Sequence, residues 1–325
     1  MNVERLWYGK RCPLNWLLLP LSGLYCGIAS IRRCWYQARS DRLAKPSVPL
    51  VVVGNITVGG TGKTPLVVWL CRRLQQEGYR PGIVSRGYGG KAGDNALAVT
   101  PDSDPSLVGD EPLLLARRTG CPLVICRDRP QAVAKLLEMH PCDVVISDDG
   151  LQHYAMHRDI EIGVLDGQRR FGNGFCLPAG PLRELQGRWD DLDLRVINGA
   201  EEAGCYGMFL QATELRALYG DIAEPLSAWE GKSVHALAGI GNPQRFFSML
   251  ESLGLQVERH AFADHHAFTE ADFAFADARP ILMTEKDAVK CRHLALKNTW
   301  YVPVDAEIDG DLGEQLLKLL ENHGQ

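Results

Sequence analysis

The stretch "GNITVGGTGKTP", residues 54–65, decides the fold of this chain. Its last part, G-K-T at 62–64, matches the end of the phosphate-binding signature G-x-x-x-x-G-K-S/T, but Thr57 stands where that signature begins with glycine. The run also fits the variant K-G-G-x-G-K-T, with Val58 in place of the extra lysine of that class. Thr57 therefore bears on the subclass of the loop rather than on phosphate binding.

The sequence on both sides gives this loop the context that a phosphate-binding loop requires. The run "VPLVVVGN" (48–55) is apolar and β-branched, and it predicts a buried strand. After the loop, apolar residues recur at helical spacing from Pro65 to Gly78. A strand, a glycine-rich turn and a helix in this order predict a nucleotide site, whereas the alternative is an ordinary turn with a chance match.

The residues of the loop have separate expected roles. Glycines at 59, 60 and 62 let backbone N–H groups approach a phosphate at the positive end of the helix. Lys63 is expected to reach the β- and γ-phosphates of ATP, and the Thr64 hydroxyl is expected to ligate Mg²⁺. The predicted nucleotide-binding residues are Thr57, Val58, Gly59, Gly60, Thr61, Gly62, Lys63 and Thr64.

Length, charge and cysteine usage exclude several classes of protein. The 325 residues allow two domains and a substantial core. The formal net charge of −5 argues against a nucleic-acid partner, which usually requires a basic surface. The ten cysteines form no C-x-x-C pair, so a zinc ribbon or a thioredoxin-type motif is absent. So many unpaired thiols suit a reducing cytosol.

The N-terminal run "PLNWLLLPLSGLYCGIAS" (13–30) carries no charged residue. A secretory signal disagrees with a site that needs cytosolic ATP, and a spanning helix would be interrupted by Pro20, Gly23 and Gly27. A helix buried against the domain is a further alternative. We favour an amphipathic or partly inserted helix that attaches the protein to a membrane without crossing it. The residues expected to hold it at the lipid surface are Trp7, Lys10, Arg11, Trp16, Arg32, Arg33, Trp35 and Arg39.

Strand-like and helix-like runs alternate downstream of the loop. Strands are expected at 80–85, 96–100, 121–127, 142–149, 160–166 and 194–199, with helices at 111–120 and 129–140. This alternation predicts an α/β fold of the P-loop NTPase type, with a doubly wound, mostly parallel sheet and ligands at the carboxyl ends of its strands. The pattern weakens after residue 200 and resumes at 233. The expected units are a membrane-associated helical segment (1–45), a P-loop domain (46–200) and a smaller α/β domain that closes over the site (201–325).

The run "VVISDDG" (144–150) ends an apolar strand with two carboxylates. A strand that closes in aspartate beside a phosphate-binding strand is the Walker B arrangement, in which Asp148 holds Mg²⁺ directly or through water. Asp149 is expected to assist or to orient its neighbours. Two adjacent acids repel each other unless a cation compensates, which favours a metal site over a solvated turn.

Three further segments leave alternatives open. Asp110 in "VGDEP" precedes a helix, and spacing alone favours an N-cap over a base that accepts a proton from an attacking hydroxyl. In "ADHHAFTEAD" (263–272) two histidines beside Asp264 are metal ligands, a base with its orienting acid, or polar loop residues. His157, four residues after His153, is interpreted as a loop residue, because no glutamate lies between them as in zinc proteases.

The third segment, "PAGPLRE" (178–184), is a proline- and glycine-rich loop. Arg183 is suited to grip a phosphate or a lipid headgroup, and Glu184 is suited to bind sugar hydroxyls. A structural pair between the two side chains is equally compatible with the sequence.

Seven motifs together resemble one family, the tetraacyldisaccharide 4'-kinases, which are the lipid A 4'-kinases of Gram-negative bacteria. The motifs run from residue 54 to 290 and are "GNITVGGTGKTP", "SRGYGG", "VGDEP", "SDDGLQH", "GPLRE", "ADHHAF" and "MTEKDAVK". The loop of that family tends to carry serine or threonine at the first glycine position, which agrees with Thr57.

The resemblance implies a specific reaction and a place for it. ATP and Mg²⁺ would serve to phosphorylate the 4'-hydroxyl of tetraacyldisaccharide 1-phosphate, giving lipid IVA and ADP at the cytoplasmic face of the inner membrane. Asp110 and His265 would form a catalytic pair, with the aspartate as the base and the histidine tuning or orienting it. This role of Asp110 overrides the N-cap interpretation. Lys63 would be the third catalytic residue. The resemblance also places Arg86, Tyr88, Gln152, His153, Arg183 and Glu184 at the site.

The expected partners follow from the substrate. Each buried CH₂ of an acyl chain contributes about 0.8 kcal/mol, so a substrate with four chains stays in the bilayer and the enzyme must bind the membrane surface. Neither a nucleic acid nor an obligate protein partner is expected. The rivals are a P-loop ATPase or GTPase switch of the partitioning or metallochaperone type and a small-molecule ligase. The chain lacks the N-K-x-D sequence that reads guanine in such GTPases.

Overall fold

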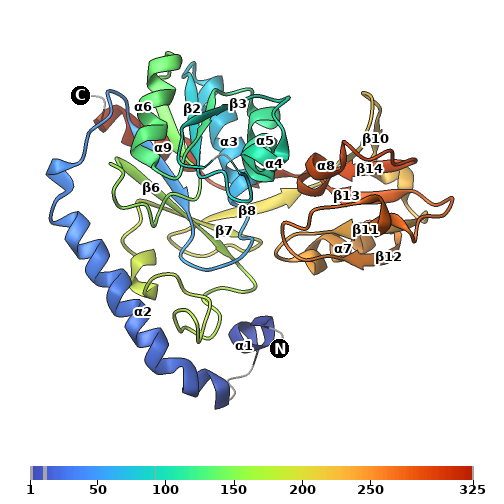
Figure 1. The fold of residues 1–325 in the computed structure, drawn as a ribbon, viewed down its shortest axis with the longest axis horizontal. Coiled ribbons are helices and arrows are strands. Elements are labelled where there is room, and N and C mark those ends of the chain that lie inside the picture. Colours follow the sequence, from blue (N-terminus) through green and yellow to red (C-terminus); the bar gives the residue numbers. More distant parts are fainter. Residues whose placement is uncertain (1–2, 10–12, 92, 324–325) are drawn as a thin grey trace.

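The structure is a computed structural model that describes residues 3–9, 13–91 and 93–323. Two sheets lie side by side, and a long N-terminal helix runs along one flank of the first (Figure 1). Lys10 and Arg11, two of the expected basic anchors, lie outside the described residues.

The first sheet has nine strands and β1, the expected strand before the phosphate-binding loop, lies at its centre. The order is β15-β8-β7-β6-β1-β5-β2-β4-β3, and all neighbours are parallel except the pairs β15–β8 and β3–β4 at the two edges. The prediction of a mostly parallel sheet is confirmed. The strands are β1 (Leu50–Gly54), β2 (Pro81–Ser85), β3 (Leu97–Val99), β4 (Leu123–Ile125), β5 (Val144–Ser147), β6 (Ile160–Asp166), β7 (Leu194–Asn198), β8 (Tyr206–Gln211) and β15 (Asp305–Ile308).

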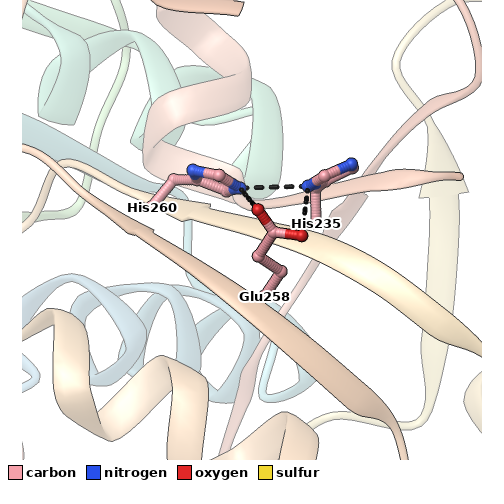
Figure 2. Close-up of side chains that lie close together, drawn as sticks. All are labelled: His235, Glu258 and His260. Atoms are coloured by element: carbon pink, nitrogen blue, oxygen red, sulfur yellow. Dashed lines mark hydrogen bonds and ion pairs between the residues drawn. The ribbon is translucent and has the colours of Figure 1, made fainter. Parts of the chain in front are cut away.

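The second sheet has six strands in the order β10-β9-β14-β13-β11-β12. Its strands are β9 (Glu214–Ala217), β10 (Ala223–Pro225), β11 (Ser233–Ala238), β12 (Gln256–Ala261), β13 (Ile281–Thr284) and β14 (Thr299–Val302). The parallel pairing of β11 with β12 sets His235 opposite Glu258, and Figure 2 shows these two side chains together with His260. Helices α7 (Pro243–Ser252) and α8 (Glu285–Cys291) belong to this half of the molecule.

The division between the two sheets differs from the expected boundary near residue 200. Strands β8 and β15 both follow that point, yet both extend the first sheet, and α9 (Leu312–His323) packs on its core. The chain leaves the first sheet after β8, builds the second, and returns. The reason is that β8 adds to β7 in the parallel direction, and β15 then pairs with β8 in the antiparallel direction as the edge strand.

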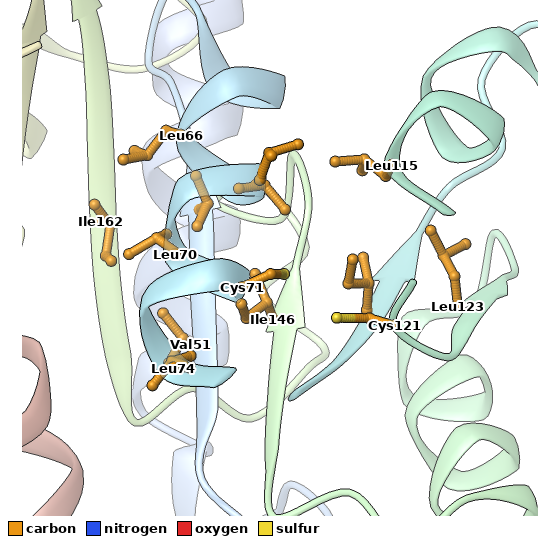
Figure 3. Close-up of a cluster of buried hydrophobic side chains, with 14 of the residues drawn as sticks. Val51, Leu66, Leu70, Cys71, Leu74, Leu115, Cys121, Leu123, Ile146 and Ile162 are labelled. Atoms are coloured by element: carbon orange, nitrogen blue, oxygen red, sulfur yellow. The ribbon is translucent and has the colours of Figure 1, made fainter. Parts of the chain in front are cut away.

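Side-chain alternation along β1 divides the core of the first sheet between its two faces. Val51 and Val53 face the helices α3 (Lys63–Gln76), α5 (Asp110–Thr119) and α9. Figure 3 shows Leu66, Leu70 and Leu74 of α3 in this layer. Leu50 and Val52 face α6 (Arg129–Met139) and the loops around Leu151 and Leu182. The sheet is therefore covered on both faces, as a doubly wound fold requires.

The N-terminal helix α2 (Pro13–Gln37) turns its polar face toward the protein. The buried Asn15 donates to the carbonyl oxygens of Leu6 (2.9 Å), in the short helix α1 (Val3–Tyr8), and of Ala179 (3.0 Å). Ser22, also buried, donates to the carbonyl oxygen of Cys176. The opposite face carries exposed apolar side chains at helical spacing: Leu17, Leu21, Leu24, Ile28, Ile31 and Trp35. This is the reverse of a helix that packs on a water-soluble core.

One disulfide departs from the expectation of unpaired thiols. Cys26 of α2 lies one turn after Ser22, on the same face, and is bonded to Cys176. The thiols of the other described cysteines are free: Cys34, Cys71, Cys121, Cys126, Cys142, Cys205 and Cys291. The spacing of cysteines in the sequence carries no sign of this pair, because the two residues are 150 positions apart.

The remaining short elements connect these units. They are the helix α4 (Pro105–Val108) and the 3₁₀ turns η1 (Ser40–Arg42), η2 (Gln186–Trp189), η3 (Leu226–Trp229) and η4 (Glu270–Phe273). At η4, Thr269 and Asp272 form a capping box.

Candidate active site

The structure explains why threonine replaces glycine at position 57. Thr57 forms an antiparallel bridge with Leu182, and its side chain is buried. The Val58 N–H donates to the carbonyl oxygen of Pro181 (2.8 Å), and the Arg183 N–H donates to that of Ile56 (2.8 Å). The start of the loop is thus held against the "GPLRE" segment, in a pairing that requires no glycine.

Glycine is required farther along the loop. Gly62 precedes α3 with φ at 96°, and a Cβ atom there would lie 2.4 Å from Nδ2 of Asn198. Asn198 ends β7, donates to the carbonyl oxygen of Thr61 (3.0 Å) and accepts from Arg245 (2.7 Å). The N-terminus of α3 therefore opens into the cleft with its backbone N–H groups available to a phosphate.

Lys63 lies at the first turn of α3 and points toward the ends of two strands. Its Nζ is 3.3 Å from Oδ1 of Asn55 and 3.5 Å from Oδ1 of Asp149. Asp149 also accepts from Arg183 at 3.2 Å. Burial acts to raise the pKa of Asp149, but the positive charges of Lys63 and Arg183 outweigh it and hold the pKa far below its usual value.

Asp148, the predicted Walker B residue, lies behind Asp149. It is only 2% exposed and accepts from Ser85 Oγ at 3.3 Å. Burial raises the pKa of Asp148 to about 7, and the negative charges of Glu111 and Asp149 add to the effect. Of the two predicted acids, Asp149 is the one that lines the cleft and contacts Lys63.

These acids suit a divalent cation. Burial raises the pKa of Asp148, and the negative charges of Glu111 and Asp149 raise it further, so three carboxylates lie near one another here. Carboxylate and hydroxyl oxygens are the ligands that Mg²⁺ takes, and Thr64 adds a hydroxyl at the start of α3. The donor set of the chain at this place therefore fits the metal that the sequence predicted.

Asp110 and His265 come together although they lie 155 residues apart. Oδ2 of Asp110 is 3.1 Å from Nδ1 of His265. Asp110 is the first residue of α5 and the cap position is Gly109, which offers no side chain, so the N-cap interpretation is wrong. Gly109 is required because its φ is 89° and a Cβ atom would lie 2.4 Å from the carbonyl oxygen of Tyr88.

The protonation of the pair is set by its surroundings. Burial acts to raise the pKa of Asp110, but the hydrogen bond from His265 and the charge of Lys286 outweigh it and lower the pKa below its usual value. The hydrogen bond to Asp110 raises the pKa of His265. Both shifts favour an aspartate that is ionised and ready to accept a proton.

Lys286, in the first turn of α8, connects the pair to its neighbours. Its Nζ lies 2.8 Å from Oε1 of Glu111, 3.4 Å from Oδ1 of Asp264 and 3.8 Å from Oδ2 of Asp110. Burial acts against its charge, but Glu111 and Asp110 outweigh that effect and raise the pKa of Lys286. A cation at this position stays charged and helps to hold Asp110 ionised.

His265 and Asp149 share a backbone feature. Each has a positive φ, 59° for His265 and 47° for Asp149, which is uncommon for residues other than glycine. Tyr88 stands edge-on to the His265 ring with centroids 5.0 Å apart. Backbone strain of this kind is concentrated at functional sites, and here it occurs at two predicted site residues.

A cleft of about 810 Å³ joins these groups. It extends from the phosphate-binding loop and Asp149 in the first unit to the "GIGNP" turn, α7 and α8 in the second. Gly241 of that turn lies against the loop, since a Cβ atom on it would be 3.2 Å from the backbone nitrogen of Gly60. The structure therefore places this turn at the site.

The predicted substrate residues divide into those that line the cleft, one that is exposed outside it, and those that are engaged within the protein. Tyr88 and Arg183 line the cleft, whereas Arg86 is exposed and lies outside its lining. Gln152 donates to Glu184 (2.8 Å) and accepts from Arg183 (3.2 Å), so Arg183 and Glu184 are bridged by Gln152 rather than paired directly.

Glu184 and His153 have less freedom than the sequence suggested. Glu184 is 6% exposed and also accepts from Tyr154, so its oxygens are already engaged inside the protein. Burial lowers the pKa of His153 to about 4, and nearby Arg129 and Arg86 add to that effect, so the ring is neutral. His157 pairs with Asp159 at 3.0 Å, which agrees with its interpretation as a loop residue.

Among the residues of the cleft that sequence reasoning missed are Glu111, Asn198, Arg245 and Lys286. Asn198 carried a usable signal, because a polar residue at the carboxyl end of an apolar strand points to the ligand edge of a parallel sheet. Glu111 and Lys286 stood inside quoted motifs, "VGDEP" and "MTEKDAVK", but received no role. Their pairing across two units is invisible in the sequence.

Comparison with known proteins gives one consistent family. The model of the family tetraacyldisaccharide-1-P 4'-kinase (LpxK) matches residues 14–321. A tetraacyldisaccharide 4'-kinase of Nitrosococcus oceani is 52% identical over 98% of this chain and 94% of its own length. One from Pasteurella multocida is 49% identical over 94% of this chain and 95% of its own. The crystal structure of LpxK from Aquifex aeolicus in complex with ATP superposes with a TM-score of 0.80, 28% identity and coverage of 94% and 99%.

Proposed function

The chain belongs to the tetraacyldisaccharide-1-P 4'-kinase family and is a kinase, and from this premise we propose how its cleft phosphorylates the 4'-hydroxyl of tetraacyldisaccharide 1-phosphate. The observation that carries the proposal is the Asp110–His265 pair, because its histidine lines the same cleft as the phosphate-binding loop and its aspartate lies directly behind that histidine. The chain of the Aquifex relative binds ATP, which supports ATP as the phosphoryl donor here. The rival P-loop switch is not favoured, because the family match covers nearly the whole chain.

Asp110 is the proposed base. The substrate hydroxyl forms a bond to the γ-phosphorus while the bond from that phosphorus to the β–γ bridging oxygen breaks, and ADP leaves with that bond's electron pair. The hydroxyl proton passes to Oδ2 of Asp110, which His265 orients and Lys286 keeps ionised. Lys63 offsets the negative charge of the transferring phosphoryl group. Direct contact of Asp110 with the hydroxyl makes it a catalytic residue, and His265 positions it.

Magnesium is proposed to be held by Thr64, Asp148 and Asp149, with Glu111 near enough to act on the same charge. When bound, the ion supplies positive charge to the phosphate oxygens. Lys63 and Arg183 already contact Asp149. Burial is the main cause of the raised pKa of Asp148, and a bound cation would favour the ionised form of this carboxyl.

The membrane contact is proposed to run along α2. The helix has 25 residues and is long and apolar enough to cross a membrane. However, Asn15, Ser22 and Arg33 tie it to the loops at 176–191 along its length, including an ion pair of Arg33 with Asp191 at 2.7 Å. If α2 crossed the bilayer, the loops that are bound along its length would have to enter the lipid with it. We therefore place it in the plane of the cytoplasmic leaflet, with its apolar face in lipid.

Substitution on the exposed face tests the membrane contact. Leu17→Gln, Leu24→Gln and Ile28→Gln combined should strongly reduce flotation with vesicles that contain anionic lipid, because each removed apolar side chain weakens insertion. These side chains are 74%, 62% and 59% exposed, so the fold should be retained. The matched control is Ile222→Gln, an equally exposed position (59%) in the second unit, which should leave flotation unchanged. Unreduced flotation of the triple variant would locate the contact elsewhere.

Phosphoryl transfer in detergent tests the reaction itself. Purified protein with γ-³²P-ATP, Mg²⁺ and tetraacyldisaccharide 1-phosphate should give a labelled lipid, and Asp110→Asn should give almost none. A label that appears only as free phosphate, with or without the lipid, would replace the kinase proposal by an ATPase.

A further inference from the structure

A second group of ligand-type side chains lies in the second sheet, outside the residues that line the cleft. Strands β11 and β12 pair in parallel, with His235 opposite Glu258 and Leu237 opposite His260. Because side chains alternate along a strand, Glu258 and His260 point to the same face as His235. The strand register alone thus brings two imidazoles and one carboxylate together (Figure 2).

The ligand atoms of these residues converge. Nδ1 of His235 lies 3.0 Å from Nε2 of His260, and each of these nitrogens lies 3.7 Å from a carboxylate oxygen of Glu258. A tetrahedral Zn²⁺ with bonds of about 2.0–2.1 Å places its ligand atoms roughly 3.3–3.4 Å apart. The two imidazole nitrogens lie slightly closer than that spacing, and Oε2 and Oε1 of Glu258 lie slightly farther than it from His235 and His260 respectively. One ligand atom from each residue lies within 4.8 Å of the other two, so one ion fits among the three side chains after small shifts.

The hydrogen bonds around His235 prepare it as a ligand. Its Nε2 lies 3.2 Å from Oδ1 of Asp277. A carboxylate at that nitrogen holds the proton there, which leaves the lone pair of Nδ1 directed at His260 and Glu258. The ring of His260 is stacked on Phe275 with centroids 3.6 Å apart, which fixes its plane. Both imidazoles are therefore oriented before any ion arrives.

The local charge also suits a cation. Asp277 and Glu258 carry two negative charges, and Arg279, which contacts both, offsets one of them. One negative charge remains on this face of the sheet. Arg279 binds Oε2 of Glu258 at 2.7 Å, which leaves Oε1 directed toward His260.

We propose that His235, Glu258 and His260 form a binding site for a divalent transition metal of the zinc class, distinct from the magnesium site of the cleft. Two imidazoles and one carboxylate are ligands that zinc accepts, and a water completes the four. The side chain of Glu258 is 49% exposed and that of His235 is 1% exposed, so the ion enters from the Glu258 side. The site joins β11 and β12, and His265 follows His260 by five residues, so the ion stabilises the strand that leads to the catalytic loop.

Zinc binding to the whole protein tests the site directly. Protein freed of transition metals and then saturated with Mg²⁺ is titrated with ZnCl₂ in competition with a chromophoric chelator. The wild type should bind one Zn²⁺ per chain at this site. His260→Gln and Glu258→Gln remove a ligand each, and Asp277→Asn removes the partner of a ligand; each should weaken binding by about 10–100-fold. Circular dichroism of each variant establishes whether it is folded. If a histidine variant is not folded, Glu258→Gln carries the test, because its position is half-exposed.

Two histidine variants serve as matched controls. His293→Gln removes an exposed histidine of the same unit, and His265→Gln removes the one in the cleft; both should retain the zinc affinity of the wild type. No zinc binding by the wild type, or equal affinity in folded His260→Gln and Glu258→Gln, would overturn the proposal. Loss of binding in His265→Gln alone would place the metal in the catalytic cleft and overturn it equally.

Discussion

The phosphate-binding loop and the Asp110–His265 pair serve the same cleft but are built in opposite ways. The loop is one continuous stretch between β1 and α3, and its lysine, threonine and glycines lie within a few residues of one another. The pair joins the start of α5 to a loop of the second unit, across 155 residues. The geometry of the loop does not depend on the position of the second unit. The pair, in contrast, exists only while the two units are held together.

Contacts across the cleft hold the two units together. Arg118 of α5 pairs with Glu285 of α8 at 2.5 Å, and Arg245 of α7 binds Asn198 at 2.7 Å. Both arginines bind to partners of the other unit, and both lie near the ends of helices that line the cleft. If the proposed roles hold, phosphate binding depends on one local stretch of this chain, whereas proton transfer depends on the contact between its two units.

The loop should show the largest effect. Lys63→Ala removes the positive charge beside the transferring phosphoryl group and should lower kcat by about 10³-fold or more, the scale on which an arginine finger acts on the same charge. The fold should persist, because Lys63 makes only long polar contacts at 3.3 and 3.5 Å. Steady-state kinetics with a thermal melt measure both. Near-normal kcat in a folded variant would remove the loop from the mechanism.

The base should come next. Asp110→Ala should lower kcat by roughly 10²–10⁴, the usual range for loss of a general base, with little change in ATP affinity. Asp110→Ser should be equally slow, because the cap of α5 is Gly109 and a serine at 110 restores no function. Recovery of rate in the serine variant would revive the N-cap interpretation.

Asp148 should have a smaller and metal-dependent effect. Asp148→Asn should raise the Mg²⁺ concentration for half-maximal rate by about 10–100-fold. In metal-free wild type, ionisation of Asp148 costs stability, because burial raises its pKa to about 7. The stability that the folded protein gains while Asp148 is protonated is complete below the ordinary carboxyl pKa of about 4. This stability is lost as the pH rises through about 7. The thermal midpoint of the wild type should therefore fall with pH relative to Asp148→Asn. A parallel pH profile of the two would contradict the charge cluster.

The smallest effect is a shift in one titration. The hydrogen bond to Asp110 raises the pKa of His265, so Asp110→Asn should lower that pKa. Histidine ¹H–¹³C NMR spectra recorded across the pH range follow the ring of His265, assigned by comparison with His265→Gln. A pKa that stays in place would show that the pair is absent in solution and would leave only the loop intact.

The sequence predicted the local parts of this molecule well. The expected strand at 160–166 coincides with β6, and the helix after the loop begins at Lys63, two residues before Pro65. Such elements follow from periodicity within ten to fifteen residues. Strand β15 (Asp305–Ile308) was missed because it is a short, partly exposed edge strand with little apolar pattern.

The parts that the sequence could not predict depend on distant contacts. The role of Asp110 came only from the family resemblance, since spacing favoured a cap. The disulfide of Cys26 with Cys176 and the ion pair of Glu111 with Lys286 join segments whose approach is set by packing. The register of β11 and β12 likewise brings His235 to His260, and no motif in the sequence announces it.

The most direct test of the assembled pair is a double-mutant cycle on kcat. Asp110→Ala, His265→Ala and the double variant are measured with saturating ATP, Mg²⁺ and lipid substrate. If the two residues act as one unit, the double variant should be about as slow as the slower single variant, because the second substitution removes nothing further. Losses that multiply would show two independent residues and would contradict the account.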